Sequence, residues 1–198
     1  MLKLKTRKTS PWRPTLKLYN ACLVAFIAAL GLSGCGIDVT SIPFEGRGSL
    51  NVGDPAPPIS IDEWFQGEGL DSLETGKVHV IEFWATWCGP CLQNMPHLSE
   101  LQTQYADEAI FIGVTDETAE KVSTFLAGEA SSGQPWSEVI TYRLGTDLNE
   151  NMYRNYMAAA NRMSLPSAFV VGKQGKITWI GHPADIDAPL QAAIAAES

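Results

Sequence analysis

Residues 87–91 read Trp87-Cys88-Gly89-Pro90-Cys91, and the predicted fold is built outward from them. They separate a strongly apolar run, residues 78–84, from a segment whose apolar side chains recur at helical spacing. This junction predicts a strand that leads into a helix, with Cys88 at the helix N-terminus. Unpaired backbone N–H groups and the helix dipole stabilise a thiolate there, so we expect the pKa of Cys88 to fall below the value of about 8.5 for free cysteine.

The two cysteines are spaced for reversible disulfide chemistry. Two intervening residues let the sulfurs close a disulfide or open to a dithiol with little backbone movement, and we expect Cys91 to be the more buried. The same spacing is half of a zinc site, but zinc needs a second pair of ligands at short spacing. The histidines are single and scattered. We therefore predict no metal and no cofactor beyond a redox-active Cys88–Cys91 disulfide.

Residues 82–91, Glu-Phe-Trp-Ala-Thr-Trp-Cys-Gly-Pro-Cys, resemble the thioredoxin superfamily, and within it the membrane-tethered TlpA-like thiol:disulfide oxidoreductases. Pro96 lies where that family kinks its active-site helix, and Leu165-Pro166 resembles its cis-proline loop. The resemblance covers about residues 52–196. It implies an α/β, thioredoxin-like fold with a central mixed β-sheet flanked by helices, and a TlpA-type insertion within residues 116–160.

The hydrophobic pattern after residue 77 predicts alternating strands and helices, closed by a hairpin and a last helix. Expected strands are residues 78–84, 109–114, 138–143, 167–171 and 176–180. A helix is expected over 116–127. Asp147 and Glu150 form a capping-box-like start to another helix. Ile186, Leu190 and Ile194 mark the last helix.

The resemblance implies roles for individual residues. Cys88 attacks a client disulfide, Cys91 resolves the mixed disulfide, and Pro166 presents its backbone to the client. Trp87, Gly89, Pro90 and Leu165 are the expected substrate-binding residues.

Glu82 interrupts the apolar strand, where a carboxylate is costly unless it is paired or protonated, so its pKa should rise. That suits a general base for Cys91. A glutamate on a solvated strand edge is the alternative.

The N-terminal region predicts export and lipidation. Residues 1–17 carry six basic side chains and no acid, and residues 21–32 are mostly apolar but short for a membrane span. We therefore expect a signal peptide over residues 1–34. Leu32-Ser33-Gly34-Cys35 resembles a bacterial lipobox, which implies a lipid on Cys35, a tether over 35–52 and a redox domain over 53–198. An ordinary signal peptide or an uncleaved anchor is the alternative.

Export also bears on the partners. Loss of residues 1–34 leaves eight basic and 22 acidic side chains, a net charge of about −14, which disfavours nucleic acid. Only Cys88 and Cys91 then remain as thiols, in an extracytoplasmic, periplasmic-side compartment that permits disulfides. We expect a protein thiol or disulfide client, an upstream membrane thiol reductant, and attachment to a bacterial membrane through Cys35.

Two other functions compete with the oxidoreductase. A thiol peroxidase shares the fold but needs a threonine three residues before its cysteine, and that position is Ala85. A non-enzymatic lipoprotein module for binding or assembly would not need the dithiol, the acid and the proline together.

Overall fold

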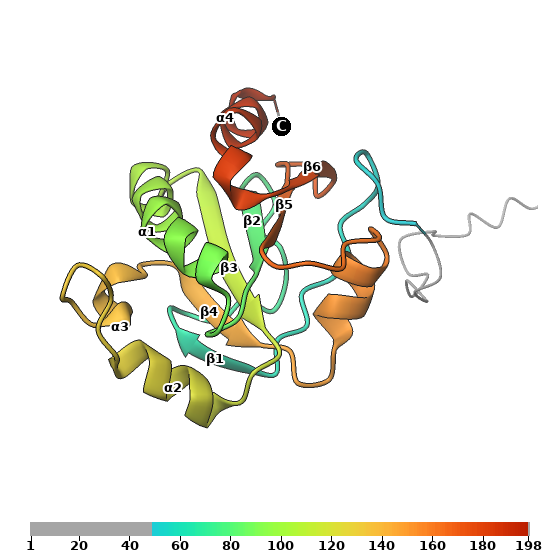
Figure 1. Cartoon of the computed structure of the whole chain (residues 1–198). Helices are drawn as coiled ribbons and strands as arrows, with labels where there is room; N and C mark the ends of the chain where they lie inside the picture. Colours follow the sequence, from blue (N-terminus) through green and yellow to red (C-terminus); the bar gives the residue numbers. More distant parts are fainter. Residues whose placement is uncertain (1–48, 198) are drawn as a thin grey trace, which may run out of the picture. The chain divides into compact units, whose positions relative to one another are not determined.

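The computed structural model of the chain describes residues 49–197, whose strands form one six-stranded sheet (Figure 1). The strands span Glu63–Gln66 (β1), Val78–Phe83 (β2), Ala109–Thr115 (β3), Arg143–Thr146 (β4), Ser167–Val171 (β5) and Ile177–Gly181 (β6). Their order is β1-β4-β3-β2-β5-β6. β2, β3 and β4 are parallel, while β1 and the β5–β6 hairpin pair antiparallel at the two edges. The predicted mixed sheet is confirmed.

Helices cover both faces of this sheet. They are α1 (Gly89–Gln104), α2 (Ala119–Ala127), α3 (Trp136–Val139), α4 (Asp187–Ala195), a π-helical segment (Tyr153–Ala158) and a 3-10 turn (Pro183–Asp185). One buried cluster joins the sheet to α1, α2 and α4, and a second includes Met152, Tyr156 and Met157. Figure 1 shows the π-helical segment, in orange, across the sheet from α1.

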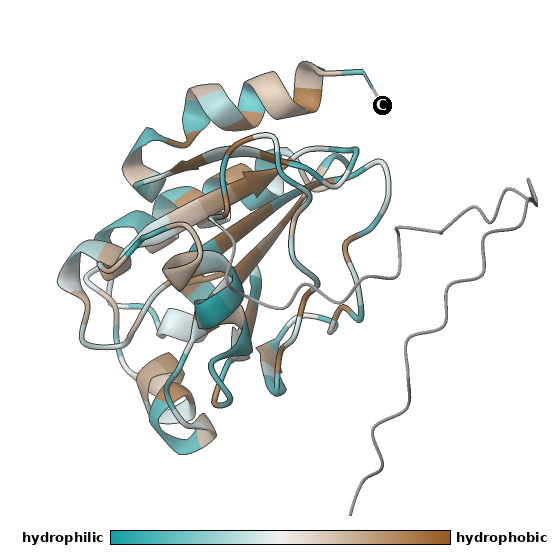
Figure 2. Cartoon of the chain, turned by 90° about the vertical axis from the view of Figure 1, so that its right-hand side faces the viewer, coloured by the Kyte–Doolittle hydropathy of each residue, from teal (hydrophilic) through white to brown (hydrophobic). Residues whose placement is uncertain are grey.

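The two central strands hold the fold together. Every residue of β2 and β3 is buried, and Figure 2 shows these strands in brown between more polar helices. Strand side chains alternate between faces. Val80 and Trp84 accordingly belong to the cluster under α1, and Ile81 and Phe83 to the other. Glu82 therefore faces the α1 side.

The predicted strand over residues 138–143 is wrong. Ile140 and Tyr142 are buried in the alternating pattern that suggested a strand. However, the carbonyl of Pro135 accepts from the N–H groups of Glu138 and Val139, which starts the short helix α3. Pairing with β3 begins only at Arg143.

The predicted capping box at Asp147 and Glu150 is only half right. The Asp147 carboxylate accepts from the N–H groups of Met152 and Tyr153, at 3.1 and 2.7 Å. Its own N–H donates to the carbonyl of Thr115 in β3, so none is available for Glu150. Glu150 instead lies in the preceding turn, with φ of 56°.

The folded domain begins before the predicted boundary at residue 53. Leu50 is buried in the second cluster, and its N–H donates to the carbonyl of Ala159 (2.8 Å). The N–H of Gly53 donates to Ile177 of β6. The end of the predicted tether therefore packs on the domain. The predicted signal peptide and Cys35 lie outside the described residues.

The remaining elements match closely. The hairpin turns at Gly175, whose φ of 71° suits glycine, and Ile186 and Leu190 are buried by the last helix. The helix expected from residue 116 begins at Ala119. Within residues 49–197, no helix has the length and apolar character needed to cross a membrane.

Candidate active site at the first turn of helix α1

The two cysteines lie where the chain passes from β2 into α1. The N–H of Cys88 donates to the carbonyl of Ala85 (3.0 Å), which closes the turn between strand and helix. Cys88 is the N-cap residue of α1, and its sulfur accepts from the N–H of Cys91 (3.3 Å). The two sulfurs are joined in a disulfide, at 2.05 Å. The predicted place of Cys88 at the helix N-terminus is confirmed.

Access to the two sulfurs is unequal. Cys91 is fully buried, as predicted, whereas 4% of Cys88 is exposed. Gly89 and Pro90 are exposed beside it, and Trp87 is 70% exposed. A partner that approaches over these three residues therefore meets Cys88 first.

Glu82 is buried on the α1 side of β2, with only 1% of its surface exposed. Its Oε2 accepts from the Tyr142 hydroxyl (3.0 Å), and its Oε1 has no hydrogen-bond partner among residues 49–197. Burial raises the pKa of Glu82 from 4.5 to about 8, against the smaller lowering effect of the Tyr142 hydrogen bond. Because β2 has a paired strand on each side, the solvated-edge alternative is wrong. In this disulfide form the side chain therefore holds a proton at neutral pH.

A glycine in β3 makes room around this carboxyl group. Gly113 pairs with Glu82, and a Cβ there would lie 2.6 Å from Leu144 and 3.1 Å from the indole nitrogen of Trp84. It would also crowd the ring of Tyr142. Only glycine therefore lets these side chains close over Glu82 and exclude water.

Glu117 is a second buried carboxylate at the site, and it was not predicted from the sequence. It accepts from the N–H and the hydroxyl of Thr86, at 2.6 and 3.0 Å, and pairs with Lys121. Burial would raise the pKa of Glu117, but the hydrogen bonds from Lys121 and Thr86 outweigh it and lower the pKa. Glu117 thus fixes the loop before Cys88. The sequence feature that could have indicated this role is the position of Glu117 just after the parallel strand β3, because functional sites in α/β proteins gather at the carboxyl ends of parallel strands.

Replacing Glu117 by glutamine should lower the free energy of unfolding by about 1–2 kcal/mol. Hydrogen bonds to charged groups contribute about 1.5–3 kcal/mol each, and glutamine keeps one acceptor for the two Thr86 donors. Chemical denaturation measures the loss. Glu120→Gln, an exposed acid in α2, is the control and should change nothing. Equal stability of both variants would show that Glu117 does not hold the loop.

Pro166 lies beside the active-site loop. The Leu165–Pro166 peptide bond is cis, as predicted. Ser167 pairs with Phe83, the last residue of β2. Pro166 therefore lies at the end of the sheet from which the loop from β2 to Cys88 starts. Leu165 and Trp87 line one cavity of about 90 Å³, together with Met163. The structure therefore brings two of the predicted substrate-binding residues to one hollow.

The predicted site residues thus gather at one end of the sheet, except Cys35, which the structure does not describe. In the described part of the chain, no three His, Cys, Asp or Glu side chains are grouped to hold a metal ion.

Several known proteins are similar in sequence. Protein FixW of Rhizobium leguminosarum is 30% identical over 138 residues, which cover 67% of this chain and 61% of FixW. Thioredoxin-like protein YneN of Bacillus subtilis is 29% identical over 129 residues, covering 65% and 69%. Thiol-disulfide oxidoreductase ResA of Bacillus anthracis is 25% identical over 162 residues, covering 80% and 86%. ResA bears the name of the enzyme class predicted here.

Solved structures confirm the fold. The thioredoxin-like superfamily protein SPOA0173 superposes with a TM-score of 0.57 and 20% identity, over 73% of this chain and 98% of its own. StoA from Bacillus subtilis gives 0.51 and 17%, over 69% and 99%. Residues 52–180 match the AhpC/TSA family. On this match and this thioredoxin-like fold, the chain belongs to the AhpC/TSA family.

Proposed function

We propose that this chain is a thiol:disulfide oxidoreductase that reduces disulfides of protein clients through Cys88 and Cys91. The observation that carries the proposal is the disulfide across the first turn of α1, with its more accessible sulfur at the N-cap. The name of ResA supports the same chemistry. Gly89 and Pro90 are the dipeptide of cytoplasmic thioredoxins, which favours the reducing direction.

The first step is attack by Cys88 on the client. Its thiolate forms a bond to one client sulfur, while the client's S–S bond breaks and the second client sulfur leaves as a thiolate. Trp87, Gly89, Pro90 and Leu165 form the surface around the mixed disulfide, and Pro166 presents its backbone to the client.

The second step is resolution by Cys91. The Cys91 thiol gives its proton to the Glu82 carboxylate and attacks the Cys88 sulfur, which releases the client's first sulfur as a thiolate. Two electrons have then passed to the client, and Cys88 and Cys91 form a disulfide. Glu82 ends protonated, in agreement with its raised pKa. A dithiol donor, proposed to be a membrane thiol reductant, then reopens the disulfide, and Glu82 returns its proton to the Cys91 thiolate, which restores the carboxylate for the next cycle.

The proposed location is extracytoplasmic, on the periplasmic side, with a lipid on Cys35 that anchors the protein to a bacterial membrane. The basic and apolar segments before Leu32-Ser33-Gly34-Cys35 support it. The acidic charge makes electrostatic attachment to anionic lipid unfavourable, so the lipid would provide the anchor.

Cys35→Ala should leave the signal uncleaved at this point and remove the acyl mass from the protein. Intact mass spectrometry of membrane fractions reads both effects. An unmodified Cys35 in the wild-type protein would overturn the proposed anchor.

Reduction of insulin by the full chain, with dithiothreitol as electron donor, tests the function. Turnover above the rate of dithiothreitol alone is expected for the wild type and should vanish in Cys88→Ser. No acceleration by the wild type would refute the reductase.

The two competing functions gain less support. Ala85 is buried and has no hydroxyl to polarise a peroxide, which disfavours a thiol peroxidase. A non-enzymatic binding module would need neither a disulfide at a helix N-cap nor a protonated acid buried behind it.

A further inference from the structure

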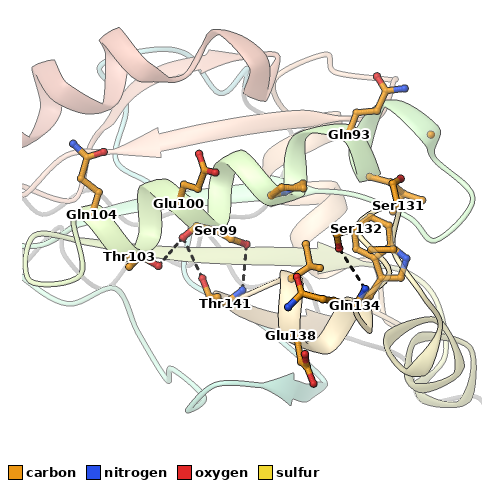
Figure 3. Close-up of a pocket in the computed structure, with 16 residues that line it drawn as sticks. Gln93, Ser99, Glu100, Thr103, Gln104, Ser131, Ser132, Gln134, Glu138 and Thr141 are labelled. Atoms are coloured by element: carbon orange, nitrogen blue, oxygen red, sulfur yellow. Dashed lines mark hydrogen bonds between the residues drawn. The ribbon is translucent and has the colours of Figure 1, made fainter.

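A groove of about 920 Å³ runs along α1 and begins at Gly89, within the dithiol turn (Figure 3). One wall is α1 from Gly89 to Gln104, and the other is residues 130–141. Leu92, Trp136 and Val139 supply apolar surface. Figure 3 shows Gln93 and Gln104 toward opposite ends of α1, with polar side chains between them.

The groove has the dimensions of an extended peptide. Gly89 to Gln104 spans about 22 Å at a rise of about 1.5 Å per helical residue, which equals six or seven residues of extended chain at about 3.3 Å each. Its active-site end is open, because a Cβ on Gly89 would meet nothing within 4 Å. A polypeptide held by Cys88 can therefore enter the groove directly.

The charged residues that line the groove are all acidic. Glu100 and Glu138 are the charged residues in its lining, and both are exposed. None of the basic side chains in residues 49–197 lines it. These are Lys77, Lys121, Arg143, Arg154, Arg162, Lys173 and Lys176. An occupant with lysine or arginine gains attraction and meets no like charge.

We infer that this groove binds the client segment next to the reacting cysteine, in extended form, and selects basic side chains; this inference rests on the proposed function. Glu100 follows Gly89 by eleven residues, about 16 Å along the helix, which corresponds to about five extended residues. Clients with lysine or arginine about five residues from their cysteine are therefore preferred.

The test uses the reduced full chain and synthetic peptides with one cysteine, joined by a disulfide to a coloured aromatic thiol. Attack by Cys88 forms the peptide mixed disulfide and releases the coloured thiolate. Each peptide carries one lysine, glutamine or glutamate, placed five residues before or five residues after the cysteine. The lysine peptide should react about two to five times faster than the glutamate peptide at low salt, as expected for one exposed ion pair. The difference should disappear near 1 M salt.

Variants separate local from general charge effects. Glu100→Gln with Glu138→Gln should lose the preference. Glu108→Gln with Glu197→Gln, two exposed acids outside the groove, makes the same change in net charge and should keep it. Glu100→Lys with Glu138→Lys should prefer the glutamate peptide. An aromatic disulfide without a peptide should react with the wild type and with each double variant at the same rate. Equal rates would show that every variant is folded.

The outcomes distinguish this inference from the proposed function. Attack on all three peptides at one rate, or a preference that survives Glu100→Gln with Glu138→Gln, overturns the groove but leaves the reductase. Failure to attack any peptide overturns the reductase itself.

Discussion

Glu82→Gln slows the resolution of a mixed disulfide by a factor of about 10²–10⁴, the usual contribution of a general base, and spares the first attack. Glutamine keeps the shape of the side chain and an acceptor for Tyr142, but it cannot take the proton of Cys91. Glu82 is expected to affect only the second step, because Cys91 and Glu82 are both buried on the α1 side of the sheet, whereas Cys88 is accessible.

An aromatic disulfide that releases one coloured thiolate per step reads both steps in a stopped-flow experiment. The first release reports attack by Cys88, and the second reports resolution by Cys91. Glu108→Gln is the control, since it removes the charge of an exposed glutamate outside the active site. A second release at the wild-type rate in Glu82→Gln would leave Glu82 a structural role only.

Glu82 should also make the disulfide form less stable as the pH rises. Its folded pKa of about 8 lies above 4.5, so between these values the folded protein binds more protons than the unfolded chain. The stability conferred by the protonated carboxyl is present below pH 4.5 and is lost as the pH rises through 8. The expected loss between pH 4.5 and 8.5 is about 4 kcal/mol, about half of it above pH 6.5.

Denaturation of the wild type and of Glu82→Gln across this range isolates the effect. The difference in free energy of unfolding cancels other titrating groups, including His79, whose pKa burial lowers to about 4. His79 works in the opposite sense, because the stability that its neutral form contributes is lost as the pH falls from 6.5 to about 4. A difference that does not change with pH would mean that Glu82 is solvated.

The central strands and the cysteine turn were predictable because each is determined by the sequence of a single short segment. Residues 109–114 are apolar throughout and residues 78–83 are apolar except for His79 and Glu82, as expected for buried parallel strands. The spacing from Trp87 to Cys91 placed the helix start, and Leu165-Pro166 placed the cis bond.

The errors arose where a distant contact decides the local structure. Ile140 and Tyr142 alternate like strand residues, but Tyr142 is directed to Glu82, sixty residues away in sequence. Glu150 does not form the predicted capping box, because the N–H of Asp147 donates to the carbonyl of Thr115 instead. Glu117 was not predicted, because its partner Thr86 is brought beside it only by the fold. Propensity and spacing carry no record of such partners.

Trapping of the mixed disulfide tests the central claim most directly. Reduced Cys91→Ser is mixed with insulin, and intact mass spectrometry measures any covalent adduct. We predict one insulin molecule joined through a disulfide to Cys88 in this variant, with release by dithiothreitol, and no adduct in Cys88→Ser. An adduct on Cys91 in Cys88→Ser, with none in Cys91→Ser, would contradict the assignment of Cys88 as the nucleophile.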